Sequence, residues 1–157
     1  HDSEAVLKNI RRLVEGAAVL DIPALVSEQY PKGLGPTVDE LQELVGELPR
    51  LEKLSFSCLR DDGLARAVEK TGRDTLLICG TEAHVCVLQT ALDAVCRGLT
   101  VHVPADAVGS RDPRNREIAL ARMREAGATV TCTESALFEM LEVAGTDEFK
   151  RISRLVK

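Results

Sequence analysis

Short apolar segments alternate with longer segments of helical periodicity along most of the chain, and this alternation restricts the fold more than any other feature. Each apolar segment is four or five residues long, which suits a buried strand. Such an order of strands and helices predicts a three-layer α/β/α fold, with a mainly parallel sheet between helices on both faces. The predicted strands are residues 24–27, 75–79, 99–103 and 128–132.

Helices are predicted before and between these strands, the first from its apolar periodicity and most of the others from capping residues and glycines at their ends. Val6, Ile10 and Leu13, for example, recur at spacings of four and three, which predicts one buried stripe. The segment 28–36 contains two Gly and two Pro and is predicted to be a loop. Residues 49–60 are predicted to be irregular or weakly extended. The predicted helices are residues 3–20, 37–47, 61–71, 84–97, 112–126 and 133–144, and a short basic tail follows them.

Composition limits the possible partners and location. The 157 residues contain no internal repeat or linker, so a single domain over residues 1–157 is predicted. A net charge of −5 with 3% aromatic residues argues against nucleic acid, which requires a basic face or stacking side chains. No apolar run approaches the roughly 18 residues of a membrane span, so no membrane partner is expected. The five cysteines include no C-x-x-C pair, which indicates reduced thiols and a cytoplasmic location.

Cys86 lies where parallel α/β sheets bind their ligands, just beyond the carboxyl end of a strand. It enters a helix, where free N–H groups and the helix dipole favour a thiolate. A free thiol has a pKa of about 8.5, so ionising most of it at pH 7 takes roughly 2.7 kcal/mol. A helix dipole supplies at most about 2 kcal/mol. A second cation is therefore required, and Lys53 is the candidate.

Both residues also have ordinary interpretations. A cysteine after a strand often packs as a small hydrophobic residue, and a lone lysine is usually a surface charge. Cys58 lies close to Lys53 in the sequence and is a reserve nucleophile. The remaining thiols lie within or at the end of apolar strands, or inside a helix, and are interpreted as packing residues: Cys79, Cys96 and Cys132.

The sequence favours neither a cofactor nor a metal. It contains no G-x-G-x-x-G or G-x-x-x-x-G-K-[ST], so no nucleotide-phosphate loop is predicted, and G-x-S-x-G is also missing. His84 and Cys86 could share a metal in principle, but residues two apart in a helical turn point in different directions. His1 and His102 do not complete a ligand spacing. We therefore expect no cofactor and no metal ligands.

Five stretches of the chain together carry a family resemblance. They are residues 27–35 (SEQYPKGLG), 52–57 (EKLSFS), 80–90 (GTEAHVCVLQT), 106–111 (DAVGSR) and 149–153 (FKRIS). In this order they resemble the isochorismatase-like cysteine hydrolases, most closely the subgroup of isochorismatase domain-containing proteins. The resemblance covers essentially all 157 residues. It implies the hydrolase fold of that family and an Asp-Lys-Cys triad.

The resemblance also implies roles for particular residues. Lys53 and Cys86 occupy the lysine and cysteine positions of the triad. The implied activity is that of a cysteine hydrolase, in which a lysine-supported thiolate attacks a small amide, ester or related carbonyl compound. The turn before the nucleophile is expected to contain a cis peptide between Thr81 and Glu82 and to form an oxyanion hole. The candidates for the substrate pocket are Gln29, Tyr30 and His84.

The triad aspartate has no counterpart in this sequence. In the family it lies on a hydrophobic first strand upstream of the first helix, and this chain begins at that helix. Asp21 lies at the opposite end of the following strand and does not qualify. Either an upstream segment is missing here, or the protein is a natural short form. In the first case the strands near 24–26 and 75–79 should not pair directly, whereas in the second they should form a continuous ladder.

Two classes of function remain. The first is the cysteine hydrolase, and the second is a non-catalytic binding or oligomerisation module of the same fold. Retention of Lys53 and Cys86 favours the hydrolase. A nucleic-acid enzyme is a third class, which the acidic charge disfavours. The loop 28–36 contains no His that could bind a metal, so nicotinamidase activity is not expected.

We also expect a homo-oligomer. The last helix and the tail carry more apolar residues than one sheet face needs. They could instead cap the domain core. The residues concerned are Leu137, Met140, Leu141, Phe149, Ile152, Leu155 and Val156.

Overall fold

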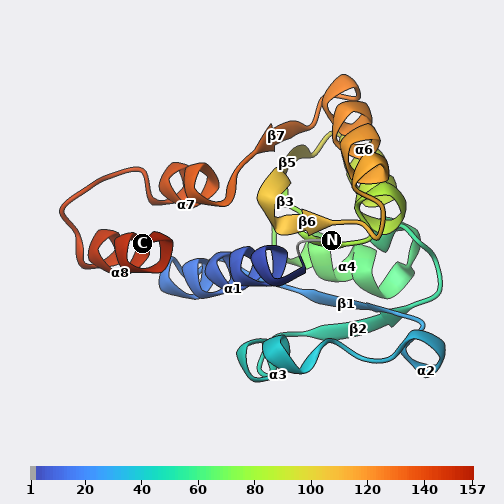
Figure 1. Ribbon diagram of the computed structural model, residues 1–157, viewed down its shortest axis with the longest axis horizontal. Coiled ribbons are helices and arrows are strands. Elements are labelled where there is room, and N and C mark those ends of the chain that lie inside the picture. The colour runs from blue at the N-terminus through green and yellow to red at the C-terminus, as the bar shows by residue number, and fades with distance from the viewer. Residues whose placement is uncertain (1–2) are drawn as a thin grey trace.

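The computed structural model describes residues 3–157, and its helices and strands alternate along the chain (Figure 1). The helices are α1 (Ser3–Val19), α2 (Pro31–Leu34), α3 (Asp39–Val45), α4 (Asp62–Lys70), α5 (Leu88–Cys96), α6 (Pro113–Glu125), α7 (Thr133–Leu141) and α8 (Asp147–Val156). The strands are β1 (Val26–Gln29), β2 (Arg50–Lys53), β3 (Thr75–Leu77), β4 (Gly80–Thr81), β5 (Thr100–Pro104), β6 (Val108–Gly109) and β7 (Thr129–Thr131). Turns of 3-10 helix at Cys58–Arg60 and Ala105–Ala107 and a π-helical turn at Ala83–Val87 complete the structure.

Every strand pair among the described residues is parallel. β5 lies between β3 and β7 in a three-stranded sheet, while β1 pairs with β2 and β4 with β6. Parallel neighbours need a crossover, and the helices between the strands provide it. Within residues 3–157, β1 and β3 are not hydrogen-bonded to each other. Of the two arrangements expected for these strands, the structure shows the unpaired one.

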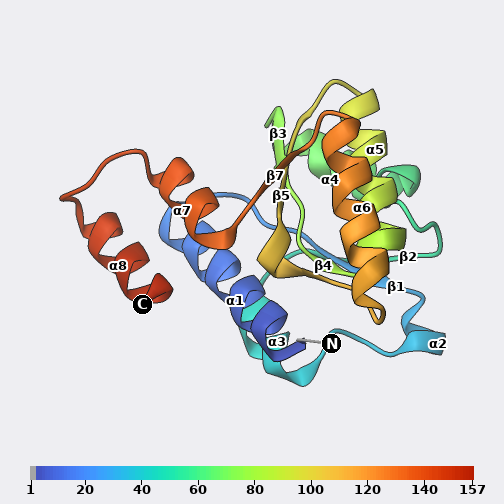
Figure 2. The same cartoon turned by 45° about the horizontal axis from the view of Figure 1, so that its top comes forward.

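Helices cover both faces of the β3–β5–β7 sheet, which confirms the predicted three-layer α/β/α class (Figure 2). One core cluster joins β5 to α5 and α6, and a second joins α1, α7 and α8. Leu76 packs against the first cluster and Leu77 against the second. Successive side chains of a strand point to opposite faces, so one apolar run serves both layers.

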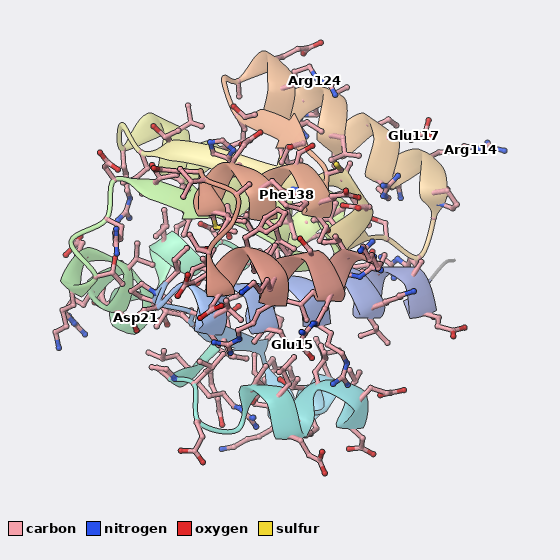
Figure 3. All side chains as sticks on the ribbon, turned by 90° about the vertical axis from the view of Figure 1, so that its left-hand side faces the viewer. Glu15, Asp21, Arg114, Glu117, Arg124 and Phe138 are labelled. Carbon is pink, nitrogen blue, oxygen red and sulfur yellow. The ribbon has the colours of Figure 1, made fainter. Side chains whose placement is uncertain are left out.

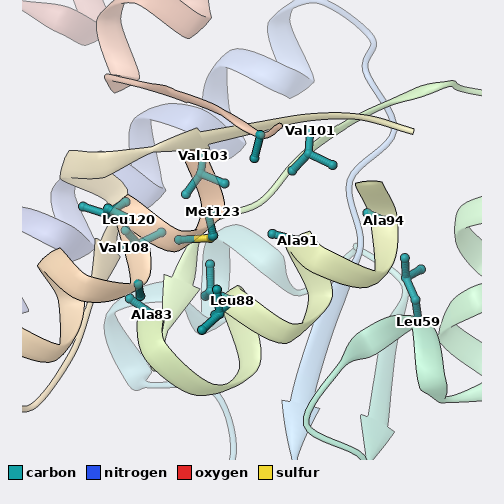
Figure 4. Close-up of a cluster of buried hydrophobic side chains, with 13 residues drawn as sticks. Leu59, Ala83, Leu88, Ala91, Ala94, Val101, Val103, Val108, Leu120 and Met123 are labelled. Carbon is teal, nitrogen blue, oxygen red and sulfur yellow. The ribbon is translucent and has the colours of Figure 1, made fainter. Parts of the chain in front are cut away.

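Small side chains line the face of α5 that packs on the sheet. Ala91 and Ala94 are 0% exposed, and Met123 of α6, also 0% exposed, belongs to the same cluster as Val103 and Val108 (Figure 4). Alanine on the buried face of a helix lets its backbone approach the sheet closely. A core without Trp is thus filled by aliphatic residues and a flexible methionine.

Apolar residues of α7 and α8 pack inside the chain. Leu137 and Ile152 are 0% exposed and Leu141 is 8% exposed. The rings of Phe138 and Phe149 lie 6.3 Å apart and are tilted, and Figure 3 looks onto the two helices that carry them. These residues are among those on which the homo-oligomer was expected. Leu137, Leu141 and Ile152 therefore serve the second core cluster, while the other residues named for the oligomer are only partly buried, and the oligomeric state stays a prediction.

Charged side chains cover the outer face of α6. Arg114, Glu117 and Arg124 are exposed and project from the helix (Figure 3). No helix within residues 3–157 is long and apolar enough to cross a membrane.

The structure differs from the predicted local structure in three segments. The segment 49–60, predicted to be irregular or weakly extended, contains the regular strand β2, which forms by pairing with β1. The loop 28–36 contains the end of β1 and the short helix α2. The basic tail forms α8, where the hydroxyl of Thr146 accepts a hydrogen bond from the Phe149 amide at 3.0 Å and so caps the first turn.

Candidate functional site

Gln29 and Lys53 are neighbours because β1 and β2 pair in parallel register. They lie opposite each other as the last residues of the two strands. Opposite residues in a ladder carry their side chains on the same face of the sheet. Lys53 Nζ accordingly donates a hydrogen bond to Gln29 Oε1. Two of the predicted site residues thus meet at the carboxyl ends of parallel strands, where ligands of such sheets bind.

Lys53 is buried, and neutral acceptors surround its ammonium group. The residue is 4% exposed, and Nζ also donates to the carbonyl oxygens of Ser55 at 3.0 Å and Phe56 at 2.9 Å. Together with Gln29, these acceptors engage all three donors of the ammonium. Within residues 3–157, Lys53 forms no ion pair, so no carboxylate among them neutralises its charge. A buried positive charge of this kind favours an anion nearby.

Cys86 lies in the π-helical turn Ala83–Val87, directly before α5, and is half-buried. Its thiol donates a hydrogen bond to Gln29 Oε1 across 3.7 Å. The same oxygen accepts from Lys53 Nζ. The structure therefore brings the predicted nucleophile and the predicted cation together around one oxygen atom.

The turn that precedes α5 contains a cis peptide between Thr81 and Glu82, as expected. His84 Nδ1 lies 3.0 Å from Ser110 Oγ and 3.3 Å from Glu82 Oε2. The Arg111 amide donates to Glu82 Oε2 at 3.2 Å. These contacts tie His84 to the loop after β6. The roles of Thr81 and Glu82 in an oxyanion hole, and of His84 in a substrate pocket, stay predictions.

Tyr30 continues the ladder past the end of β1, where its amide donates to the Lys53 carbonyl at 2.9 Å. Its φ of 41° lies in the left-handed region and turns the chain into α2. The ring packs against Gly33, where an added Cβ would lie 2.2 Å from Tyr30 Cε1. The residue is 50% exposed, and its assignment to the substrate pocket stays a prediction.

The other thiols agree with their predicted roles only in part. Cys79 is partly buried, and burial raises its pKa to about 11, as suits a packing residue. Cys96 and Cys132 are exposed, so their interpretation as packing residues is wrong. Cys96 is the last residue of α5, and Cys132 is the N-cap of α7. Cys58, the reserve nucleophile, donates to Ser27 Oγ at 3.4 Å.

Thr90 is a residue of the site that the sequence analysis did not identify. It is 4% exposed, and its hydroxyl donates to the Cys86 carbonyl at 2.7 Å and accepts from the Cys58 amide at 3.0 Å. A Ser or Thr in a helix often bonds the carbonyl four residues earlier, and this spacing was the available signal. The approach of Cys58 depends on tertiary structure alone.

Glu28 supports the site from the opposite side of β1. Its Oε1 accepts hydrogen bonds from Thr37 Oγ1 at 2.6 Å and the Thr37 amide at 2.8 Å, and lies 3.6 Å from a guanidinium nitrogen of Arg50. The hydrogen bonds from Thr37, with the charge of Arg50, hold the pKa of Glu28 below its ordinary value of 4.5. These contacts connect the β1–β2 pair to the segment that leads into α3.

We expect this carboxylate to make stability fall on acidification. Because the folded pKa lies below the unfolded value of 4.5, the contribution is complete above that pH and is lost as the pH falls through the folded pKa. Glu28→Gln should remove this part of the pH dependence. The measurement is the free energy of urea unfolding at about pH 7 and about pH 3 for both proteins. An equal loss in the two would contradict the prediction.

The arrangement as a whole suits nucleophilic catalysis by a thiol. A half-buried sulfur and a buried cation share one amide oxygen at the strand ends. Within the described part of the chain, no hydrogen bond or ion pair links Cys86 or Lys53 to a carboxylate. In residues 3–157 no group of three or more His, Cys, Asp or Glu is placed to hold a metal ion.

Comparison with known proteins places the chain in a family. The family model described as Isochorismatase domain matches residues 1–135. The chain belongs to the isochorismatase family. Secreted isochorismatase effector Isc1 of Phytophthora sojae is 40% identical over 156 residues, which cover 97% of this chain and 74% of that protein. Isochorismatase domain-containing protein 1 of Salmo salar is 42% identical over 147 residues. This match covers 94% of the chain but only 52% of that relative.

Solved structures show the same fold. The MAR1 ribonuclease of Caenorhabditis elegans superposes with a TM-score of 0.90 at 38% identity, over 98% of this chain and 79% of that one. YcaC from Pseudomonas aeruginosa, solved with hexane-2,5-diol and covalent acrylamide, has a TM-score of 0.89 at 28% identity, over 97% and 77%. The YcaC product of Escherichia coli, described as an octameric hydrolase of unknown specificity, has a TM-score of 0.90 over 98% and 78%, and its 24% identity shows the fold alone.

Family membership confirms the resemblance found in the sequence and the hydrolase fold that it implies. The matched residues 1–135 include Lys53, Cys86 and Gln29. Isochorismatase-family relatives carry different functions in their names, among them an effector and a ribonuclease. Membership therefore specifies the fold and the hydrolase class, and does not specify a substrate.

Proposed function

We propose that this isochorismatase-family chain is a cysteine hydrolase that acts on a small amide, ester or related carbonyl compound. Cys86 is the nucleophile, and Lys53 is the cation that stabilises its thiolate. The observation that carries the proposal is the meeting of the Cys86 thiol and the Lys53 ammonium at one oxygen of Gln29. No proton acceptor is assigned to residues 3–157.

The chemistry divides a slow hydrolysis into two easier steps. The Cys86 sulfur attacks the carbonyl carbon and forms a carbon–sulfur bond. The carbon–nitrogen or carbon–oxygen bond breaks, and the leaving amine or alcohol departs with the proton that the thiol has lost. Water then attacks the thioester, which releases the acid and restores the thiol. Lys53 stabilises the sulfur anion before the first step and after the second. The turn that contains Thr81 and Glu82 is the proposed location of the oxyanion hole.

A relative supports a reactive nucleophile in this fold. YcaC from Pseudomonas aeruginosa carries covalent acrylamide, and it is 28% identical to this chain. Acrylamide is an electrophile, and thiolates are the most reactive protein nucleophiles toward such reagents.

Trapping the acyl intermediate tests the proposal directly. The protein is mixed with an excess of p-nitrophenyl acetate at about pH 6.5 and quenched in acid, and fragment-ion mass spectrometry locates the added acetyl group. We expect the acetyl group on Cys86 in the unmodified protein and none at position 86 in Cys86→Ser. Cys58→Ser is the matched control, because Cys58 is close to the site but donates to Ser27, and it should label Cys86 normally. Acetylation of Cys58 in place of Cys86 would contradict the assignment.

Ribonuclease activity is a second candidate, because the Caenorhabditis elegans relative named a ribonuclease is 38% identical. The net charge of −5 and the 3% aromatic content argue against RNA as the partner. Incubation with a labelled single-stranded RNA separates the two candidates. Cleavage that disappears in Cys86→Ser would make RNA the substrate, while intact RNA beside an acetylated Cys86 favours the small carbonyl compound.

A non-catalytic binding or oligomerisation module of the same fold is the alternative to catalysis, and it predicts no acyl group on Cys86. A homo-oligomer is proposed here only by analogy with the Escherichia coli neighbour, which is described as octameric. A cytoplasmic location also stays a prediction, since the Phytophthora sojae relative is named a secreted effector.

A further inference from the structure

The side-chain amide of Gln29 has only one orientation that satisfies its neighbours. The Lys53 ammonium can only donate, so the atom that faces it must be the amide oxygen. The Leu54 carbonyl can only accept, so the atom 2.9 Å from it must be the amide nitrogen. These two contacts decide the assignment of oxygen and nitrogen from the hydrogen-bond network. The atom 3.7 Å from Cys86 Sγ is therefore an acceptor, Oε1.

An acceptor at this position favours the protonated thiol. The S–H group donates to Oε1, whereas a thiolate would face the lone pairs of the same oxygen. Lys53 does not donate directly to the sulfur, because its three N–H groups are used by Oε1 and by the carbonyls of Ser55 and Phe56. Its charge therefore acts on Cys86 across the Gln29 oxygen.

We propose that Gln29 is a positioning residue that holds Cys86 as a thiol in the resting protein and keeps Lys53 from donating to its sulfur. Activation then requires Oε1 to turn away from Sγ, which frees one N–H of Lys53 for the thiolate. The inference rests on the proposed function, because it concerns the same nucleophile. It gives Gln29 a role in controlling the thiol, in addition to the predicted place in the substrate pocket.

Alkylation by iodoacetamide tests this role without any substrate. The rate at Cys86 is measured by residue-resolved mass spectrometry from about pH 5.5 to about pH 9. Gln29→Met keeps the length of the side chain and removes the acceptor, so we expect alkylation at about pH 6.5 to become roughly three- to tenfold faster, as loss of one hydrogen bond allows. Gln29→Glu places a carboxylate beside Sγ, so alkylation should become slower. The midpoint of the pH profile should move down in the first variant and up in the second.

Other titratable groups near this contact do not explain opposite shifts. Besides Lys53 on β2, they are Cys58 in the neighbouring 3-10 turn, and Glu82 and His84 in or beside the turn of Cys86. All four are the same in both variants. A titration of any of them therefore contributes alike to the two profiles.

Gln42→Met is the matched control. Gln42 also donates to a backbone carbonyl, that of Thr37, and accepts from a charged side chain, Arg50 at 3.1 Å, but Cys86 makes its side-chain contact with Gln29 instead. The alkylation profile of Cys86 should be unchanged in this variant. Cys79 serves as an internal sensor of the fold, because burial raises its pKa to about 11 and it should stay unlabelled in every variant.

The role of Gln29 is overturned if Gln29→Met alkylates no faster than the unmodified protein, or if both variants move the profile in the same direction while Cys79 stays protected. If iodoacetamide labels Cys79 in Gln29→Met, the fold of that variant is disturbed, and Gln29→Glu is then compared with the unmodified protein alone. The role is overturned if the pH midpoint of Cys86 alkylation does not move up in Gln29→Glu. Failure of the proposed function looks different. Opposite shifts can occur in a protein whose Cys86 never takes an acyl group, and acylation of Cys86 can occur without any shift.

Discussion

Lys53→Met is expected to slow the alkylation of Cys86 at about pH 6.5 by roughly 10- to 100-fold. An opposite charge close to an ionisable group commonly changes its proton affinity by one to two orders of magnitude, and Lys53 is one shared oxygen away from the sulfur. Methionine has nearly the same length and shape but carries no charge. The loss should be greatest below pH 7, where thiolate is scarce, and should shrink as the pH rises. The measurement is the rate of iodoacetamide modification at Cys86 as a function of pH.

Lys70→Met is the matched control for the loss of a lysine charge. Lys70 is the exposed last residue of α4, and its replacement should leave the rate at Cys86 unchanged. Lys53→Met also leaves the Ser55 and Phe56 carbonyls without their donor, so its free energy of unfolding is measured in parallel. A folded Lys53→Met protein that alkylates at the normal rate would remove Lys53 from the site.

Leu137→Ala is expected to lower the free energy of unfolding by about 2–5 kcal/mol. Leu137 is 0% exposed and lies in the second core cluster with Leu13 and Ile152, which joins α1, α7 and α8. Its neighbour Gly16 is so close that an added Cβ would lie 2.2 Å from Leu137 Cδ2. The truncated side chain would leave a void between three helices, and their backbones cannot all move inward to fill it. Urea unfolding at neutral pH measures the change.

Leu34→Ala makes the same chemical change on the surface. Leu34 is 72% exposed at the end of α2, so its replacement should alter the free energy of unfolding by less than about 0.5 kcal/mol. A difference between the two variants of under about 1 kcal/mol would show that α7 and α8 contribute little to the stability of the domain.

Local sequence patterns predicted the framework of the fold. The apolar runs at 75–79, 99–103 and 128–132 became β3, β5 and β7, because a segment buried on both faces must be apolar throughout. The helix α1 followed from its apolar periodicity, and α4, α5 and α6 followed from glycines just beyond their ends. The segment of β2 was predicted only as irregular or weakly extended, because its polar residues Arg50 and Glu52 carry no strand signal of their own.

The site was predictable to a similar degree. The position of Cys86 between a strand and a helix follows from local order, and the need for a cation follows from the magnitude of a helix dipole. The choice of Lys53 depended on the family resemblance as well. Neither source placed the amide of Gln29 between the two groups, nor the hydroxyl of Thr90 between Cys86 and Cys58.

The sequence by itself determined the α/β class, the family and the two residues that carry the proposed chemistry, because periodicity, helix ends and family motifs all lie within short stretches of chain. Only the tertiary structure decided how these residues act on one another. Lys53 and Gln29 are 24 positions apart and meet through the parallel register of β1 and β2, while Cys86 reaches the same oxygen from 57 positions away. Strand register and the approach of a helical turn to a strand end depend on hydrogen bonding and packing between distant segments, and no local pattern records them.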